Sequence, residues 1–289
     1  MMSEANGTPA SAAGTISLGG ELRVNRMGFG AMRLTGPGIW GPPKDEPEAR
    51  RVLSRAIELG VDFIDTADSY GPEVSERLIG ETLRPYPEGL VIASKGGLRR
   101  TGPGQWPSDG RPEHLRAALE GTLRRLGLER VDLYQFHRPD PRVPFEESVG
   151  TIVNLQREGK VRLVGLSNVS VSQLRTALGM TEVASVQNRF NLMDRHSDDV
   201  LNLCEQLGIA FLPWAPLGQS DPARLGGPLG ELATAHGVTT GQVALAWLLA
   251  RSPQMLVIPG TSSVAHLEEN VAAAGLALES EELRRLDAA

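Results

Sequence analysis

The fold of this chain is decided by the stretch Asp62-Phe63-Ile64-Asp65-Thr66-Ala67-Asp68-Ser69-Tyr70-Gly71. The apolar run Gly60–Ile64 predicts a buried strand, and Gly71-Pro72 marks a turn after it. Between the run and the turn lie a carboxylate, Asp65, and a phenol, Tyr70. A strand that delivers polar side chains at its carboxyl end is typical of a βα unit that contributes to an active site.

Three further strand-like runs end in the same way. Leu90–Ser94 precedes Lys95, Val131–Phe136 precedes His137, and Val161–Leu166 precedes Ser167-Asn168. A segment with helical periodicity follows each run. Because the carboxyl ends of parallel strands meet at one end of a barrel, we expect these polar side chains to face one another.

The rest of the chain continues the alternation of strands and helices. Further strands are expected at Met27–Ala31, Val183–Gln187, Ile209–Pro213 and Met255–Pro259. Helices are expected at Glu48–Leu59, Val74–Leu83, Pro112–Leu126, Phe145–Glu158, Val171–Leu178, Ser197–Leu207, Gln242–Arg251, Val264–Ala273 and Glu281–Leu286. Eight strands alternating with helices predict an α/β fold, the (β/α)8 or TIM barrel. We predict one domain, residues 15–289, that begins with a β-hairpin around Gly19-Gly20 and follows a disordered tail, residues 1–14.

Composition narrows the classes of function. The chain has 289 residues, of which 40% are hydrophobic and 22% charged, as expected for a soluble globular protein. A net charge of −6 argues against nucleic acid or an anionic membrane as the main partner. Cys204 is the only cysteine, which excludes an intrachain disulfide and favours a reducing cytoplasm. We expect a cytoplasmic monomer in which Cys204 is a buried structural residue.

Three Gly- and Pro-rich loops interrupt the pattern at residues 35–47, 96–111 and 218–230. All three follow strands, so they belong to the face that carries the polar side chains. Trp40 and Trp106 lie in two of them and are candidate walls of a substrate pocket. Solvated spacers are the alternative interpretation of these loops.

Asp65, Tyr70, Lys95 and His137, in this order on consecutive strands, resemble the catalytic tetrad of the aldo-keto reductases. The resemblance covers nearly the whole chain and implies NAD(P)H-dependent reduction of aldehydes or ketones to alcohols. Considered singly, each residue also has a structural explanation, such as a turn cap for Asp65 or a loop aromatic for Tyr70.

Carbonyl reduction explains the four residue types chemically. Tyr70 would give a proton to the carbonyl oxygen, and a nearby Lys95 ammonium favours phenolate and so is expected to lower the pKa of Tyr70. Asp65 would hold Lys95 charged and oriented. His137 would donate a hydrogen bond to the same oxygen and stabilise its developing charge.

The resemblance also implies the residues that bind the cofactor. Ser167, Asn168 and Gln187 correspond to the groups that hold the nicotinamide amide, and Trp214 to the ring that stacks on it; barrel lining is the other interpretation of Trp214. The phosphates and adenosine would lie near the start of the Val264–Ala273 helix. The full set of candidate cofactor residues is Gly30, Ala31, Met32, Asp65, Ser167, Asn168, Gln187, Trp214, Ala215, Pro216, Leu217, Gly218, Ile258, Pro259, Gly260, Thr261, Ser262, His266, Glu269 and Asn270. No metal site is expected.

Two positions depart from the family pattern. Gly260 stands where many members have lysine, and His266 where many have arginine. Both family residues bear on the 2′-phosphate, so we expect NADPH as the cofactor with NADH as the alternative. Two segments, GPGIWGPPKD and GTSSVAHLEEN, resemble a bacterial branch that includes pyridoxine 4-dehydrogenase-like reductases. Pyridoxal-like or other small aldehydes are the substrates that this narrower likeness implies.

Two other functions compete with a reductase. The first is an NADPH-sensing regulatory subunit with vestigial reductase activity, as the potassium-channel β subunits of the superfamily suggest. The second is a metal-dependent barrel hydrolase, which needs several His or carboxylate ligands that converge on a metal. His137 alone among the five histidines ends a predicted strand, which disfavours the hydrolase.

Overall fold

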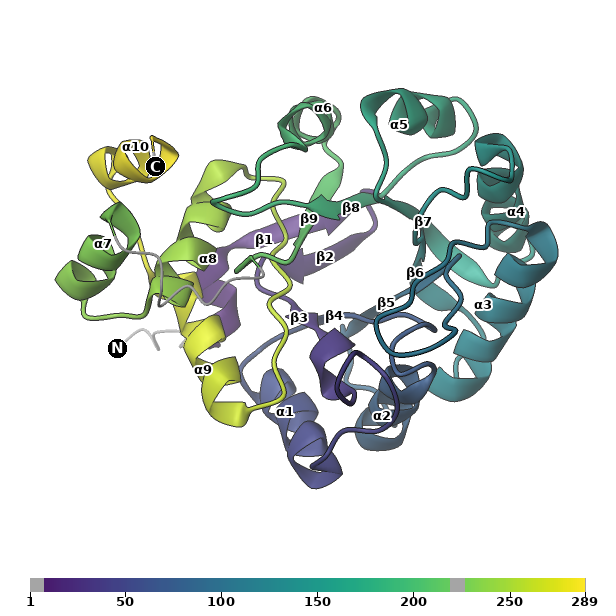
Figure 1. Ribbon diagram of the computed structural model, residues 1–289, viewed down its shortest axis with the longest axis horizontal. Helices are drawn as coiled ribbons and strands as arrows, with labels where there is room; N and C mark the ends of the chain where they lie inside the picture. The colour runs from purple at the N-terminus through teal and green to yellow at the C-terminus, as the bar shows by residue number, and fades with distance from the viewer. Residues whose placement is uncertain (1–7, 219–226, 289) are drawn as a thin grey trace, which may run out of the picture.

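A computed structural model describes residues 8–218 and 227–288. Seven parallel strands form one curled sheet in chain order, with helices around its outside (Figure 1). These strands are β3 (Phe29–Gly30), β4 (Phe63–Asp65), β5 (Val91–Gly96), β6 (Val131–Phe136), β7 (Val161–Ser167), β8 (Ser185–Arg189) and β9 (Ala210–Trp214). An antiparallel hairpin of β1 (Thr15–Leu18) and β2 (Leu22–Asn25) precedes them, as predicted.

Apart from α7, which was not predicted, the helices follow the predicted pattern closely. They are α1 (Glu46–Glu58), α2 (Val74–Leu83), α3 (Pro112–Leu126), α4 (Phe145–Arg157), α5 (Val171–Leu178), α6 (Asp198–Leu207), α7 (Pro228–His236), α8 (Thr240–Arg251), α9 (Val264–Ala272) and α10 (Ser280–Asp287). The described residues also form short 3-10 helices, η1 (Pro9–Ala13), η2 (Ala31–Leu34) and η4 (Ala273–Gly275). Cys204 is fully buried in α6, and burial raises the pKa of its thiol to about 12, as suits a structural residue.

Two predictions about the chain need correction. Residues 8–14 were predicted to be tail, but η1 packs on the domain, where Ala10 is buried and its N–H donates to the Leu59 carbonyl oxygen at 3.0 Å. The predicted loop 218–230 is also too long, since α7 begins at Pro228, a proline in the first helical turn. Residues 219–226 of that loop lie outside the described part of the chain.

The predicted eighth strand, Met255–Pro259, forms isolated bridges and not a continuous ladder. Met255 pairs with Phe211 of β9, and Val257 pairs with Met27 just before β3. The Val257 carbonyl accepts from the Gly28 N–H at 2.8 Å, and the Pro259 carbonyl accepts from Gly30 at 3.3 Å. The segment therefore lies between the first and last strands of the sheet.

Residues 28–30 and 257–260 form a seam between the first strand and the segment 255–259. The two backbones approach so closely there that neither Gly30 nor Gly260 has room for a Cβ atom. A Cβ atom at Gly260 would lie 2.5 Å from the Gly30 carbonyl oxygen, and one at Gly30 would lie 2.6 Å from the Ile258 oxygen. Arg26 adds hydrogen bonds from its guanidinium to the carbonyls of Leu249, Ser252 and Met255. Close packing against the Gly30 backbone thus explains why a glycine stands at position 260 in this chain.

Alternation along the strands separates two apolar clusters. Side chains such as Phe63, Ala93 and Leu133 point into the sheet's interior, where Leu18 and Val24 of the hairpin also pack. Their neighbours, such as Tyr134 and Phe136, contact the helices outside. Because side chains alternate with a period of two, the residue two positions after each interior residue also points inward.

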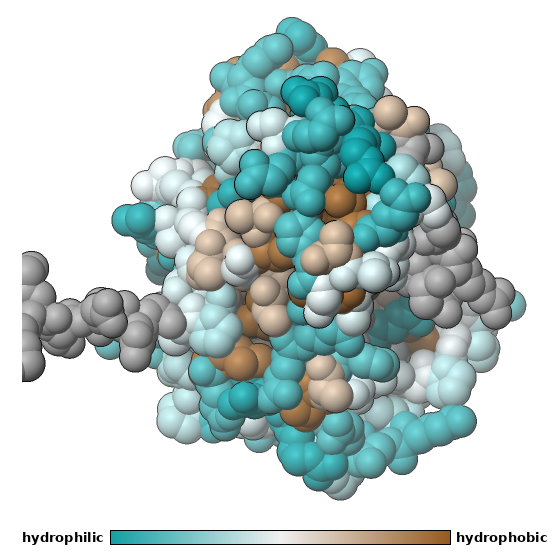
Figure 2. Space-filling view, turned by 90° about the vertical axis from the view of Figure 1, so that its left-hand side faces the viewer, coloured by the Kyte–Doolittle hydropathy of each residue, from teal (hydrophilic) through white to brown (hydrophobic). Residues whose placement is uncertain are grey.

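Hydrophobic residues are scattered over one side of the molecular surface (Figure 2). Figure 2 shows the face that carries α7 and α10, on which hydrophobic residues form small groups among hydrophilic ones. None of the helices within residues 8–218 and 227–288 combines the length and the hydrophobicity that a membrane span requires.

The close backbone contact at Gly260 leads us to expect that adding one methyl group there destabilises the protein. Gly260→Ala should lower the free energy of unfolding by about 1–3 kcal/mol, because its Cβ meets a backbone oxygen that cannot move aside. Gly275→Ala is the matched control, since nothing lies within 4 Å of a Cβ there, and it should change stability by less than about 0.5 kcal/mol. Urea denaturation measures both. Equal stability of wild type and Gly260→Ala would show that the seam is looser than described.

Candidate active site

Lys95 is the centre of the site. Its side chain is fully buried at the end of β5, where its Nζ donates to Asp65 Oδ2 at 2.6 Å, to Tyr70 Oη at 3.1 Å and to the Thr66 carbonyl at 3.0 Å. Asp65 is the second interior position of β4 after Phe63, and Lys95 follows Ala93 on β5 in the same way. The predicted neighbours therefore meet because the alternation of adjacent parallel strands directs them inward.

Asp65 has two further partners. Gln135 Nε2 donates to Asp65 Oδ1 at 3.0 Å, and Gln187 Nε2 donates to the same oxygen at 2.8 Å. Gln135 is not among the predicted site residues, although it stands two residues after Leu133 and two before His137 on the interior face of β6. Gln187 is a predicted cofactor residue, and its amide nitrogen binds Asp65. Both oxygens of the buried carboxylate are thus satisfied, as a buried charge requires.

Burial and neighbouring opposite charges shift the pKa values of Lys95 and Tyr70 in opposite directions. Burial disfavours the ammonium, but attraction to Asp65 and Tyr70 outweighs it, so the pKa of Lys95 is raised. At Tyr70 burial is the larger effect and raises the pKa above its ordinary value, while Lys95 lowers it in part. The expected net lowering of the Tyr70 pKa is therefore wrong, because desolvation of the phenolate exceeds the attraction of a lysine already paired with Asp65.

His137 lies beside Tyr70, with ring centroids 5.9 Å apart in an edge-to-face arrangement. Its Nδ1 is 3.5 Å from Ser69 Oγ. Burial, with the positive charges of Lys95 and Arg138, holds the pKa of His137 well below its ordinary value. The imidazole is therefore neutral, with one N–H for donation.

Ser167, Asn168 and Trp214 form one connected group beside the tetrad. The Asn168 amide nitrogen donates to the His137 carbonyl and to Ser167 Oγ, both at 3.0 Å. Its oxygen accepts from Trp214 Nε1 at 3.0 Å. Asn168 has φ of 58°, which asparagine tolerates better than most residues. The Trp214 ring is thus fixed by its N–H, and it is half-buried, so part of it remains accessible.

The loop 214–218 and the segment 258–262 follow the last strands. Ala215 has φ of 52°, and its carbonyl accepts from Asn191 at 3.0 Å and from the Gly218 N–H at 2.8 Å. Of the predicted residues, Gly30 lies next to residues 258–260, and Ala31 and Met32 follow it in η2. Pro216, Leu217 and Pro259 belong to these same segments.

The start of α9 is less open than predicted. Glu48 Oε1 of α1 accepts from the Val264 N–H at 3.0 Å, and the Glu48 pKa is lowered by this bond and by Arg51. A carboxylate therefore already occupies the first N–H of the helix. Ser262 and His266 are exposed, and Thr261 is buried with its Oγ1 accepting from the Ser263 N–H.

The remaining two candidates on α9 are partly engaged within the protein. Glu269 Oε1 accepts from Thr239 Oγ1 at 2.6 Å, which joins α9 to the start of α8. Asn270 is buried.

The two tryptophans of the predicted pocket flank the tetrad. The Trp106 ring lies 6.4 Å from the Tyr70 ring in an edge-to-face arrangement. Trp40 forms an isolated bridge with Gly71, next to Tyr70. Both side chains are half-buried. The loops 35–47 and 96–111 thus bring two half-buried tryptophans next to residues 70–71.

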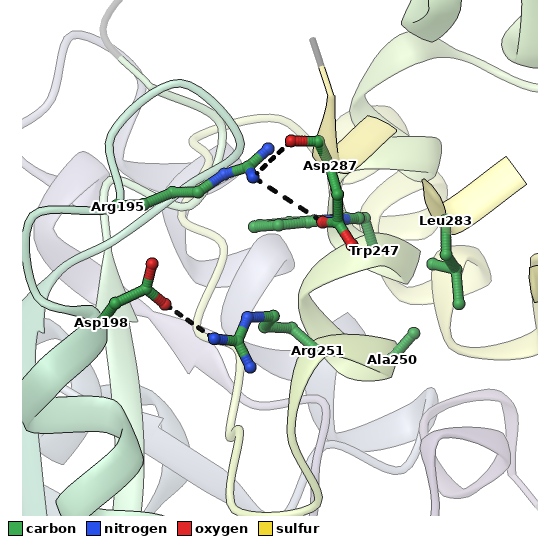
Figure 3. Close-up of a pocket in the computed structure, with 7 residues that line it drawn as sticks. All are labelled: Arg195, Asp198, Trp247, Ala250, Arg251, Leu283 and Asp287. Carbon is green, nitrogen blue, oxygen red and sulfur yellow. Dashed lines mark hydrogen bonds and ion pairs between the residues drawn. The ribbon is translucent and has the colours of Figure 1, made fainter. Parts of the chain in front are cut away.

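Figure 3 shows a surface cavity of about 390 Å³ whose lining includes no tetrad residue. It is lined by Arg195, Asp198, Trp247, Ala250, Arg251, Leu283 and Asp287. Its charged groups already have partners, because Arg251 pairs with Asp198 at 2.8 Å and Arg195 donates to the Asp287 carbonyl at 2.9 Å. We assign it a structural role in anchoring α10. Within residues 8–218 and 227–288, no group of three or more His, Cys, Asp or Glu converges as a metal site would.

Comparison with known proteins identifies the family. The aldo/keto reductase family model matches residues 26–289. The chain is 52% identical over 278 residues to an uncharacterized oxidoreductase of Schizosaccharomyces pombe, covering 96% of this chain and 90% of that one. It is 42% identical over 275 residues to pyridoxine 4-dehydrogenase of Escherichia coli, covering 93% and 96%. The chain belongs to the aldo/keto reductase family.

Solved structures agree with this assignment. A thermostable aldo-keto reductase in complex with the inhibitor epalrestat matches with a TM-score of 0.83 at 32% identity, covering 95% of this chain and 98% of the other. An aldo-keto reductase of Klebsiella pneumoniae in complex with NADPH matches with a TM-score of 0.80 at 28% identity, covering 95% and 94%.

The lowered pKa of His137 predicts a pH dependence of stability. Below about pH 6.5 the unfolded chain binds a proton that the folded chain excludes, so stability should fall with decreasing pH until the folded pKa is reached. The expected contribution is up to about 1.4 kcal/mol per pH unit. His137→Gln should remove it.

Urea denaturation of both proteins at pH 5, 6 and 8 tests this expectation. At pH 8 histidine is neutral in the folded and the unfolded state. The difference in the free energy of unfolding between wild type and His137→Gln at this pH therefore measures the packing change alone. Parallel stability curves for wild type and His137→Gln would contradict the neutral assignment.

Proposed function

We propose that this protein reduces aldehyde or ketone carbonyls to alcohols with NADPH. The observation that supports this most directly is the buried Lys95 ammonium, which contacts both the Asp65 carboxylate and the Tyr70 hydroxyl. Membership of the aldo/keto reductase family points to the same reaction class.

Each side chain has a distinct role in the proposal. Tyr70 gives its proton to the carbonyl oxygen as that oxygen gains negative charge. The raised pKa of Tyr70 keeps the hydroxyl protonated, and an alkoxide is basic enough to take the proton. Lys95 stabilises the phenolate left behind, and Asp65 holds Lys95 in place. Neutral His137 donates a hydrogen bond to the same oxygen.

The residues present suit a nicotinamide cofactor, which would supply the hydride when bound. Trp214 offers a half-buried ring fixed by its bond to Asn168, a surface on which a planar ring can stack. The exposed Ser262 and His266 offer polar groups for the adenosine phosphate. The Klebsiella pneumoniae relative, solved with NADPH, supports the same choice, with NADH as the alternative.

Further features belong to this proposal. The bridges of residues 255–257 to Phe211 and Met27 support a closed (β/α)8 barrel with a reduced eighth strand. Similarity to pyridoxine 4-dehydrogenase supports pyridoxal-like or other small aldehydes as substrates. A cytoplasmic location, which the single cysteine favours, and a monomeric state both remain predictions.

Tyr70→Phe tests the proton donor. The variant should lose at least about a hundredfold in kcat for carbonyl reduction while its affinity for NADPH stays the same, because only the transferred proton is missing. Steady-state kinetics on a panel of aldehydes, with cofactor binding followed by tryptophan fluorescence, provides both values. Near-full turnover by the variant would exclude Tyr70 as the donor. Cofactor binding by the wild type without turnover of any carbonyl would favour the regulatory alternative.

Glu48 provides a second test, directed at the cofactor. Its carboxylate at the start of α9 should repel a 2′-phosphate, so Glu48→Gln, which keeps an oxygen for the Val264 N–H, should tighten NADPH binding about fivefold. NADH affinity should not change. Glu58→Gln, at the other end of α1, is the charge-matched control. Equal effects of Glu48→Gln on both cofactors would place the phosphate elsewhere.

A further inference from the structure

Arg100, in the loop between β5 and α3, joins three separate loops through backbone carbonyls. Its Nη1 donates to Ile39 O at 2.6 Å and to Ser69 O at 2.8 Å. Its Nη2 donates to Gly38 O at 3.0 Å, and its Nε to Gln105 O at 2.9 Å. The planar fork of a guanidinium can serve several acceptors at fixed angles, which a lysine ammonium cannot do.

The same guanidinium lies over both tryptophans of the pocket. Its central carbon is 3.6 Å from the ring centroid of Trp106 and 5.5 Å from that of Trp40. These distances are within the range of cation–π contacts. Arg100 therefore fixes the two indole rings as well as the backbones that carry them.

Two contacts connect this cluster to the proton donor. Ser69, whose carbonyl binds Arg100, directly precedes Tyr70, and the ring of Trp106 packs edge-to-face on the ring of Tyr70. A displacement of Arg100 would thus move a wall of the site and the backbone next to Tyr70 together.

Ile39 supports the view that this arrangement is enforced by its surroundings. Its φ is 55°, a region that β-branched residues seldom adopt. Such a conformation persists when neighbouring contacts determine it. Here the Ile39 carbonyl is held by Arg100, and the preceding Gly38 carbonyl accepts from Arg100 and from the Gly104 N–H.

We propose that Arg100 is a positioning residue that makes Trp40 and Trp106 a rigid aromatic wall beside Tyr70 and so selects carbonyl substrates with a planar aromatic substituent. The proposal rests on the reductase function proposed above. Both indoles keep part of their surface exposed, so an aromatic ring can pack on them, whereas a short aliphatic chain gains little from that contact.

The test compares two aldehydes, benzaldehyde and propanal, in the full-length protein. Arg100→Met keeps the length of the side chain but removes its donors and charge, and Arg100→Lys keeps the charge but removes the planar fork. In both variants the KM for benzaldehyde should rise at least about tenfold, while the KM for propanal changes less than about threefold. The affinity for NADPH should stay within about threefold, and any change in kcat should be the same for both aldehydes, because Ser69 adjoins Tyr70 whichever substrate is bound. Arg99→Met, at the exposed neighbouring position, is the control and should leave all values unchanged.

Two readouts without turnover complete the design. The near-UV circular dichroism of the tryptophans should weaken in the Arg100 variants while the far-UV spectrum is retained. Benzyl alcohol, detected by tryptophan fluorescence, should bind the wild type more tightly than Arg100→Met, which decides the proposal even if no aldehyde is turned over.

Three outcomes would contradict the role proposed for Arg100 or for the protein. If KM rose equally for benzaldehyde and for propanal in the Arg100 variants, Arg100 would only stabilise the fold. Unchanged kinetics, or absent benzyl alcohol binding in the wild type, would refute an aromatic wall held by Arg100. Failure of the wild type to reduce either aldehyde would count against the proposed function, whereas the binding comparison would still judge Arg100.

Discussion

The site depends on one buried ion pair, that of Lys95 with Asp65. Neither side chain contacts water appreciably, so each charge needs a partner, and loss of either one would leave the other uncompensated at a cost of several kcal/mol. Gln135 and Gln187 bind the second oxygen of Asp65, and Tyr70 takes the remaining direction of the ammonium. The orientation of Tyr70 therefore follows from an electrostatic requirement of the sheet interior.

The two tryptophans beside Tyr70, Trp40 and Trp106, are positioned by loops and not by strands. The strands direct Asp65 and Lys95 inward by alternation, but the loops that carry Trp40 and Trp106 have no regular structure to align them. Hydrogen bonds from one guanidinium to backbone carbonyls replace the missing ladder. The Asp65–Lys95 pair is thus positioned by the sheet, whereas Trp40 and Trp106 are positioned by side-chain contacts across loops.

Local signals made much of this structure predictable. α2, α3, α5 and β6 have the bounds expected from periodicity and turn residues, and the tetrad residues meet as expected. Helix α7 was missed because the Gly- and Pro-rich segment before it suggested a longer loop, although Pro228 and Gly237 are ordinary start and stop signals. The packing of Ala10 could not be predicted, because it depends on the surface to which η1 docks.

Local patterns were enough to predict most of the alternating strands and helices and the polar residues at strand ends, because periodicity and turn chemistry depend on neighbouring residues only. The tertiary structure alone decided three other matters. Burial reversed the expected shift of the Tyr70 pKa, Glu48 reached the start of α9 from another helix, and a close backbone approach required glycine at position 260. Each depends on distances between residues far apart in the chain, which no local pattern encodes.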